Sequence, residues 1–245
     1  MNTINLNVEI EEASNRESSW TYNKQFDEDG YLKVENLYNP KELFSDVPEL
    51  RGQLNYFDKK NKDIFHHIYE ETQVNGSVSR YNYPQCRVIH NKIKKKVENI
   101  IGRELYTTYF FDRFYFSGQE LKRHTDRGSC EISVSVHVDT NLPDNLKEWP
   151  FKIKSLDVKD GDRIIRGEER SVNLNPGDGV IYKGCECPHW RDPMPSPKNK
   201  LSLGKKHKEY YYHQIFFHYV LADGLRCQFA WDTLNGAGNG VLIGG

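Results

Sequence analysis

The sequence predicts a mainly β protein of the sandwich or jelly-roll type, with N-terminal α-helices that buttress one sheet. Three observations predict this fold. At least six short segments of alternating or aromatic apolar residues follow one another between about residues 103 and 229, turn signals separate them, and the helical patterns lie only ahead of them. With 245 residues, of which 37% are hydrophobic, the chain is long enough to bury the core of one such domain.

We expect three regions along the chain. Residues 1–24 are polar, show no sustained period and are expected to form an arm that gains order only by packing on another surface. Residues 25–232 are expected to form a single domain. Residues 233–245 are expected to form a mobile tail, because five of the 18 glycines lie there.

The charge and cysteine content narrow the class of protein. Because 34 basic residues balance 35 acidic ones, no electrostatic bias favours nucleic acid or an anionic membrane, and nucleic acid is not an expected partner. No segment approaches the roughly 18 apolar residues that span a bilayer, and the polar N-terminus does not resemble a signal peptide. Five irregularly spaced cysteines are typical of reduced thiols. We therefore expect a soluble, cytoplasmic protein without disulfides.

The elements ahead of the β region begin with a turn at residues 27–30 and a half-buried strand over 31–37, where apolar and polar residues alternate. Asn39 and Pro40 are typical of the N-cap and the first residue of a helix. A longer helix is predicted over 86–101, where apolar residues recur at helical spacing and a glycine follows. Its lysine run is interpreted as a solvated face, with a phosphate-binding patch as the alternative.

The β region itself is divided by two turn signals. An Asp-Gly pair and an Asn-Pro-Gly-Asp segment are typical of hairpin turns. Strict alternation of apolar residues with Ser or His indicates a strand in the middle of the region. The expected strands cover residues 106–116, 132–138, 151–158 and 214–221, and the turns lie at 160–161 and 175–178.

Two His-x-Asp pairs offer metal ligands. His124 and Asp126 lie on one face of an extended segment, and His189 could complete a facial triad that leaves three adjacent positions of a six-coordinate Fe(II) for other ligands. His137 and Asp139 form a second such pair and compete for the same role. A His-x-Asp pair arises by chance about once in two chains with this many histidines, so the pairs alone do not decide.

The sequence around the first pair resembles a known family. Residues 115–126 (YFSGQELKRHTD) contain a tyrosine, a Gly-Gln turn and the His-x-Asp pair, and residues 175–182 (NPGDGVIY) form a turn and strand ahead of His189. Residues 26–32 (FDEDGYL) are similar to an entry strand of the same family. These motifs resemble those of the Fe(II)/2-oxoglutarate-dependent dioxygenases, particularly the prolyl-4-hydroxylase-like branch, and the spacing between the two histidines is typical of that group.

The resemblance implies a double-stranded β-helix, which is a jelly-roll variant. It implies a hydroxylase that uses Fe(II), O2 and 2-oxoglutarate, which is decarboxylated to succinate, to oxidise a C–H bond of a small-molecule or peptide substrate. It implies that His124, Asp126 and His189 bind the iron, whereas His137 occupies a strand position that usually carries an aromatic residue. Tyr115 occupies the position of a tyrosine that hydrogen-bonds 2-oxoglutarate. Neither the substrate nor the oligomeric state is predicted.

The chain departs from the family pattern at the anchor of 2-oxoglutarate. The family holds the far carboxylate with an Arg or Lys in the strand after the distal histidine, but residues 210–219 contain neither. Arg191 follows that histidine by two residues, so an extended segment points both to one side, and its planar fork suits a carboxylate. The alternative for Arg191 is a surface ion pair with Asp192. His213 is a further cofactor-binding candidate, and lysines of the loop 193–208 are less favoured.

Three other functions remain open. A catalytically silent jelly roll that binds a metal or small ligand would explain the missing anchor. A zinc-dependent hydrolase could use the same triad, although it would need an added general base. Cys185 and Cys187 stand close to His189 and could contribute to a structural zinc site, although the remaining cysteines are isolated.

Overall fold

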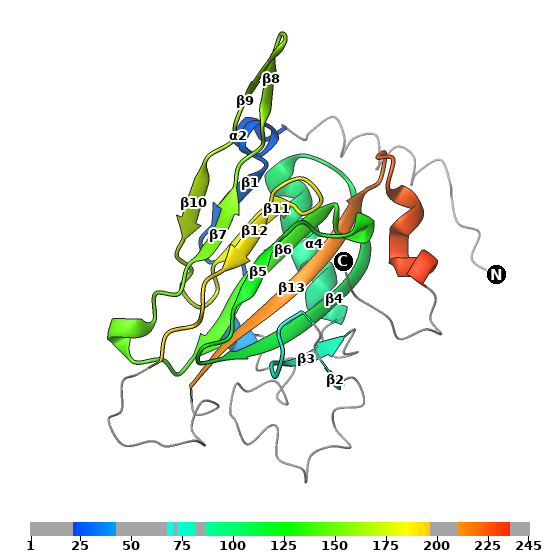
Figure 1. The fold of residues 1–245 in the computed structure, drawn as a ribbon. Coiled ribbons are helices and arrows are strands. Elements are labelled where there is room, and N and C mark those ends of the chain that lie inside the picture. Colours follow the sequence, from blue (N-terminus) through cyan, green and yellow to red (C-terminus); the bar gives the residue numbers. More distant parts are fainter. Residues whose placement is uncertain (1–21, 43–67, 71–72, 82–86, 197–209, 236–245) are drawn as a thin grey trace, which may run out of the picture.

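The computed structural model describes residues 22–42, 68–70, 73–81, 87–196 and 210–235 (Figure 1). The predicted arm therefore lies almost entirely outside the described residues. So do the glycine-rich tail beyond residue 235 and the lysines of residues 197–209.

Two antiparallel sheets and a separate hairpin make up the β structure (Figure 1). The larger sheet has seven strands in the order β1-β11-β6-β13-β4-β3-β2, and the smaller has four in the order β10-β7-β12-β5. Hairpin β8–β9 stands apart from both. The strands are β1 (Tyr31–Val34), β2 (Ile68–Glu70), β3 (Val78–Tyr81), β4 (Leu105–Phe116), β5 (Leu121–His124), β6 (Ile132–Thr140), β7 (Phe151–Lys154), β8 (Val158–Asp160), β9 (Arg163–Ile165), β10 (Glu169–Val172), β11 (Gly179–Lys183), β12 (His189–Arg191) and β13 (Tyr211–Leu221). The mainly β class predicted from the sequence is confirmed.

The two sheets pack face to face through apolar side chains. Phe151 and Ile153 of β7 lie in one cluster with Val180 and Tyr182 of β11. Because side chains alternate between the faces of a strand, each central strand of the larger sheet sends one set of residues toward the smaller sheet and the other set away from it. The side chains on the inner face of the larger sheet therefore line any site that lies between the two sheets.

Helix α4 (Arg87–Ile101) covers the outer face of the larger sheet. Ile89, Ile93 and Val97 recur every four residues, are fully buried, and share a cluster with Phe217 of β13. Lys92 and Lys95 point away from this interface and are exposed, as a solvated helix face requires. The helix thus closes the core on the side opposite the smaller sheet.

The first elements differ from expectation. The turn predicted at residues 27–30 is instead the end of helix α2 (Lys24–Asp29), which begins where the Asn23 side chain accepts a hydrogen bond from the N–H of Phe26. Strand β1 ends at Val34, three residues earlier than predicted, because the chain turns at Asn36 with φ of 51°. The Asn36 N–H then bonds the Asp178 carboxylate rather than a neighbouring strand.

Of the four strands predicted in the β region, three are confirmed and one is divided. The segment predicted as a strand over 151–158 splits into β7 and β8, because the Leu156 N–H leaves the sheet to bond the carbonyl of Asp29. The predicted hairpin turn at Gly161 has φ of 58°, a left-handed conformation that glycine adopts freely. Residues 40–42 are helical after Asn39, as predicted, and the continuation of that helix lies outside the described residues.

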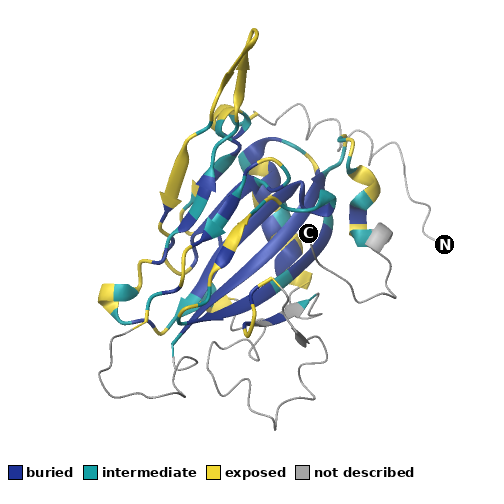
Figure 2. Cartoon of the chain, viewed as in Figure 1, coloured by how far each residue is buried: buried dark blue, intermediate teal, exposed yellow. Residues whose placement is uncertain are grey.

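Burial follows this architecture. Figure 2 shows that β13 and much of β4 are buried, whereas hairpin β8–β9 is exposed. The 3-10 segments η5 (Gly128–Cys130), η6 (Asp144–Leu146) and η7 (Cys227–Asn235) complete the described chain, and η7 is interrupted by a kink of non-helical backbone at Ala230–Asp232. None of the described helices has the length and apolar character needed to cross a membrane.

Candidate metal centre

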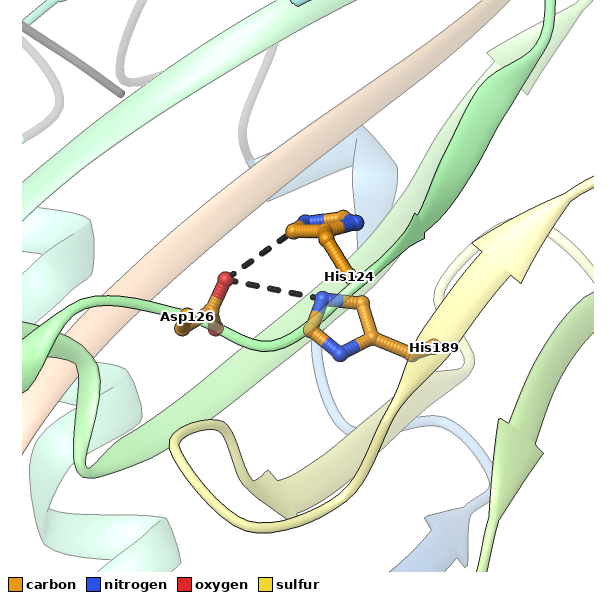
Figure 3. A group of neighbouring side chains, drawn as sticks. All are labelled: His124, Asp126 and His189. Atoms are coloured by element: carbon orange, nitrogen blue, oxygen red, sulfur yellow. Dashed lines mark ion pairs between the residues drawn. The ribbon is translucent and has the colours of Figure 1, made fainter. Parts of the chain in front are cut away.

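Three predicted ligands converge at one end of the smaller sheet (Figure 3). His124 ends β5, His189 begins β12, and the two are cross-strand partners with ring centroids 4.3 Å apart. Asp126 follows β5 by two residues, and its Oδ1 lies 3.7 Å from Nε2 of His124 and 3.5 Å from Nε2 of His189. Strand pairing therefore brings two imidazole nitrogens and one carboxylate oxygen together.

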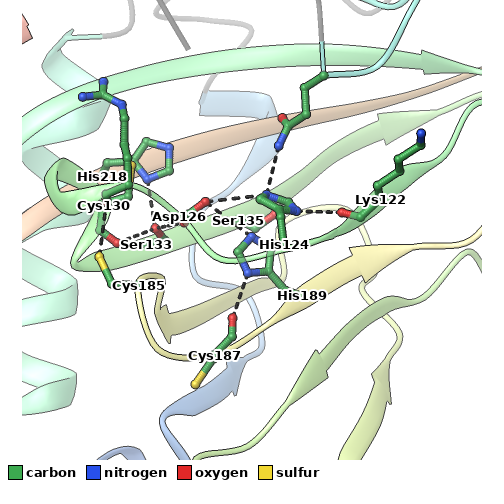
Figure 4. Close-up of polar contacts among 12 residues, drawn as sticks. Lys122, His124, Asp126, Cys130, Ser133, Ser135, Cys185, Cys187, His189 and His218 are labelled. Atoms are coloured by element: carbon green, nitrogen blue, oxygen red, sulfur yellow. Dashed lines mark hydrogen bonds and ion pairs between the residues drawn. The ribbon is translucent and has the colours of Figure 1, made fainter. Parts of the chain in front are cut away.

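Backbone carbonyls fix the orientation of both imidazoles (Figure 4). Nδ1 of His124 lies 2.7 Å from the carbonyl oxygen of Lys122, and Nδ1 of His189 lies 3.0 Å from that of Cys187. A carbonyl oxygen only accepts, so Nδ1 carries the proton in each neutral ring and Nε2 presents a lone pair. Histidine ligands of metals are usually held in this way.

The charge state of the three side chains His124, Asp126 and His189 suits a bound cation. Burial raises the pKa of Asp126, but the His189 imidazole and the Ser133 hydroxyl favour the charged form more strongly, so the pKa lies well below its usual range. Burial, reinforced by His189, lowers the pKa of His124, so this ring is neutral at pH 7. Two imidazole nitrogens and one carboxylate oxygen form a donor set that Fe(II) accepts.

The competing His137–Asp139 pair is arranged differently. Nδ1 of His137 lies 2.8 Å from the carbonyl oxygen of Leu174, and the Asp139 carboxylate accepts a hydrogen bond from the Tyr211 hydroxyl. Among the residues the structure describes, neither side chain belongs to a group of three potential metal ligands. The structure thus brings together the first pair and the distal histidine, and leaves the second pair apart.

A second group of three ligands shares Asp126 and adds Cys130 and His218. Burial raises the pKa of the Cys130 thiol well above its usual value, so the thiolate needed for a metal is disfavoured. Burial likewise raises the pKa of Cys185 to about 11 and of Cys187 to about 12. Neither of those two cysteines lies in a ligand group within the described part of the chain, so nothing there supports a structural zinc.

Arg191 is a buried cation with unused donors. Its side chain is 1% exposed, Nη1 donates to the carbonyl of Trp149, and neither Nε nor Nη2 has a hydrogen-bond partner. The guanidinium lies over the rings of Trp149 and Tyr212, with Cζ 4.5 Å and 4.8 Å from their centroids. Asp192 pairs with Lys152 instead, and no described carboxylate forms an ion pair with Arg191. A buried charge without a counterion is costly, so the arrangement indicates an anion site.

Tyr115 lies close to Trp149, and its hydroxyl is held by Arg113, which was not a candidate in the sequence. The Tyr115 ring is fully buried and contacts Trp149 edge to face at 5.0 Å. Its hydroxyl accepts a hydrogen bond from Nη1 of Arg113, two residues earlier on β4, at 2.9 Å. Nη2 of Arg113 donates to Oε1 of Gln73, whose Nε2 lies 3.0 Å from Nε2 of His124. A polar chain thus connects Tyr115 with Nε2 of His124.

The structure does not bring His213 to this site. Its Nε2 lies 2.7 Å from the Asp112 carboxylate, and its ring stacks on Phe114 at 3.9 Å, both on the outer face of the larger sheet. The neighbouring Tyr212 faces inward, and consecutive residues of a strand face opposite sides. His213 is therefore separated from the triad by the sheet itself.

Comparison with known proteins shows the fold. No protein-family model and no curated protein matches the sequence. Among solved structures, a prolyl-4-hydroxylase from Pseudomonas putida is 12% identical with a TM-score of 0.53, and the alignment covers 79% of this chain and 94% of the other. The non-heme α-ketoglutarate-dependent epimerase SnoN of nogalamycin biosynthesis is 13% identical with a TM-score of 0.53, covering 81% and 80%. HygX from Streptomyces hygroscopicus, with nickel and 2-oxoglutarate bound, is 8% identical with a TM-score of 0.53, covering 83% and 89%. The jelly-roll fold predicted from the sequence is confirmed, and the chain shares it with these solved structures.

Proposed function

We propose that this protein is an Fe(II)- and 2-oxoglutarate-dependent dioxygenase that hydroxylates a C–H bond of a small molecule or peptide. One observation carries the proposal: His124, Asp126 and His189 place three potential ligand atoms within 4.8 Å of one another, between the same two sheets as a buried arginine without an acidic partner. The fold supports the proposal but does not establish the activity.

The protein ligands would hold the metal on one side only. His124 and His189 would supply nitrogen and Asp126 oxygen, which leaves adjacent positions for a chelating co-substrate and O2. Iron with 2-oxoglutarate and O2 supplies the oxidising chemistry when bound, whereas the protein supplies orientation and a dry pocket. The carbonyls of Lys122 and Cys187 hold the two rings, and Ser133 holds Asp126.

Arg191 and Tyr115 would hold the co-substrate. The two unused donor nitrogens of Arg191 can pair with the far carboxylate of 2-oxoglutarate. Because the Tyr115 hydroxyl accepts from Arg113, its own proton is directed elsewhere and can be donated to a ligand oxygen. Trp149 and Tyr212 would exclude water from this end of the pocket. The missing basic residue in residues 210–219 thus gives no reason to prefer a silent binding protein.

The test is anaerobic titration with Fe(II) followed by 2-oxoglutarate, with a visible absorption spectrum at each step. We expect a weak metal-to-ligand charge-transfer band that needs both components, and its loss in His189→Ala. A matched control is His90→Phe, which replaces a buried histidine on helix α4 and should keep the band. Iron binding without a 2-oxoglutarate-dependent band in the wild type would replace the dioxygenase with a silent metal-binding protein.

A further inference from the structure

His137, which the triad does not use, is buried with one ring nitrogen unsatisfied. Its side chain is 2% exposed, Nδ1 is engaged by the carbonyl of Leu174, and Nε2 has no hydrogen-bond partner. Buried polar atoms without partners are uncommon in folded proteins and call for an explanation. A ligand that supplies the partner is one such explanation.

His137 and Arg191, which each have a buried polar atom without a partner, both contact the ring of one tyrosine. The His137 ring stacks on Tyr212 with centroids 4.0 Å apart, and Cζ of Arg191 lies 4.8 Å from the centroid of the same ring. His137 comes from β6 of the larger sheet and Arg191 from β12 of the smaller one. Gln214, the register partner of His137 on β13, adds a buried amide oxygen without a partner. Each of these three side chains thus has a buried polar atom without a hydrogen-bond partner among the described residues, and the two sheets supply them jointly.

We propose that His137 is a second partner of the anion held by Arg191, and that the far carboxylate of 2-oxoglutarate binds with uptake of one proton by His137. This inference rests on the proposed function, because it assigns the same co-substrate. It concerns how that co-substrate is held and at what pH.

The protonation argument follows from the hydrogen bond to Leu174. Because Nδ1 already donates to that carbonyl, Nε2 of the neutral ring can only accept, and an acceptor repels a carboxylate. Once protonated, Nε2 donates to the anion instead. Burial, together with the charge of Arg191, lowers the pKa of His137 to about 3 without a ligand, so the free protein holds this ring neutral at pH 7. A bound carboxylate favours the charged ring and supplies the proton linkage.

The other charged and titratable groups near His137 are already engaged. The Asp139 carboxylate accepts from Tyr211, and the Asp178 carboxylate accepts two backbone N–H groups and lies 3.7 Å from Lys33. His213 lies on the outer face against Asp112. Burial raises the pKa of Tyr212, so this phenol stays protonated. Because the described charged groups near His137 already have partners, we expect a bound anion to be the group that changes its charge.

The test is calorimetric titration of the Mn(II)-loaded protein with 2-oxoglutarate in two buffers of different ionisation enthalpy. We expect uptake of close to one proton per ligand at pH 7, and a Kd that rises by about tenfold per pH unit where uptake is complete. The control ligand is 2-oxopentanoate, which has the same chain length without the far carboxylate and should bind weakly with no uptake.

Two variants separate hydrogen bonding from protonation. His137→Gln offers an amide donor without titrating, so it should bind 2-oxoglutarate with no proton uptake and little pH dependence. His137→Phe keeps the stacking on Tyr212 but removes the donor, which should weaken binding by about 10- to 150-fold. Mn(II) affinity, which should not change in either variant, reports correct folding.

The possible outcomes distinguish a failure of the role of His137 from a failure of the proposed dioxygenase function. Binding of 2-oxoglutarate without proton uptake in the wild type, or with the same uptake in His137→Gln, would overturn the role of His137 and leave the dioxygenase intact. If 2-oxoglutarate did not bind to the metal-loaded protein at any pH, the proposed function would itself be wrong.

Discussion

The Ser133 hydroxyl donates a hydrogen bond to Oδ2 of Asp126 at 2.7 Å. Because Oδ2 is engaged in this way, the carboxylate cannot rotate freely, and Oδ1 faces the two histidines. Ser133 in turn lies 3.0 Å from Nδ1 of the buried His218. A serine on β6 of the larger sheet thus orients the carboxylate of Asp126, which belongs to the loop after β5.

We predict that Ser133→Ala lowers metal affinity by about 10- to 100-fold, the range found when a residue that orients a metal ligand is lost. Mn(II) titration measures the effect. The matched control is Ser135→Ala, two residues later on the same face of β6, because the Ser135 hydroxyl accepts a hydrogen bond from the Gln214 amide, whereas the Ser133 hydroxyl donates to Asp126. Equal metal affinity in Ser133→Ala and the wild type would contradict the assigned role.

Replacement of Arg191 tests the anchor. We expect Arg191→Gln to raise the Kd for 2-oxoglutarate by about 10- to 150-fold, because a charge-assisted bidentate pair contributes roughly 1.5 to 3 kcal/mol. Arg191→Lys should recover only part of this loss, since an ammonium does not reproduce the fork. Binding of 2-oxoglutarate and of Mn(II) are both measured by calorimetry, and the metal affinity should change little. An unchanged Kd in Arg191→Gln would move the anchor elsewhere, for example to the lysines outside the described residues.

Replacement of Gln73 is expected to have the opposite effect on metal affinity. Its Nε2 lies 3.0 Å from Nε2 of His124, so this hydrogen bond would have to break before a metal could bind to that nitrogen. Gln73→Leu should therefore tighten Mn(II) binding by about 2- to 10-fold, the equivalent of one ordinary net hydrogen bond. Asn75→Ala, an exposed change two residues away, is the control. Weaker metal binding in Gln73→Leu would show that Gln73 assists the site instead.

Protonation of His90 is expected to cause part of the loss of stability at low pH. Burial lowers its pKa to about 3, below an ordinary value near 6.5, so the unfolded chain binds the proton first as the pH falls. Stability is therefore complete above pH 6.5 and decreases toward pH 3, by at most about 1.4 kcal/mol per pH unit for this group. Urea unfolding at pH 7.5, 6 and 5 should show a shallower loss in His90→Phe, whose ring would lie among Phe110, Phe217 and Tyr219. Identical slopes in the two proteins would refute this contribution.

Local sequence was sufficient where the site depends on short spacing. The pair His124 and Asp126 lies within three residues, and Arg191 follows His189 by two, so one extended segment places each pair. His213 could not be placed in this way, because aromatic and polar residues occur on both faces of residues 210–219 and give no phase for the alternation. The inward set begins at Tyr212, which only the pairing of β13 with β4 and β6 determines.

Long-range contacts explain the other omissions. Arg113 sits in an aromatic strand, and nothing nearby in sequence indicates that it is 2% exposed or that it meets Gln73, 40 residues earlier. Helix α2 was missed because its signals are a single cap at Asn23 and one buried side chain, Phe26, in a short acidic segment. In both cases the deciding interaction is one side-chain contact rather than a repeated pattern.

The pairing of His124 with His189 also has a consequence for folding. The two ligands belong to different strands and are separated by most of the central β region, so a metal bound to both would act as a cross-link that closes a long loop. Such a cross-link favours the native chain over the unfolded one, and a metal present at about 100 times its Kd would add roughly 2.7 kcal/mol of stability. The side chains that would bind the metal would then also increase the stability of the smaller sheet against heat and denaturant.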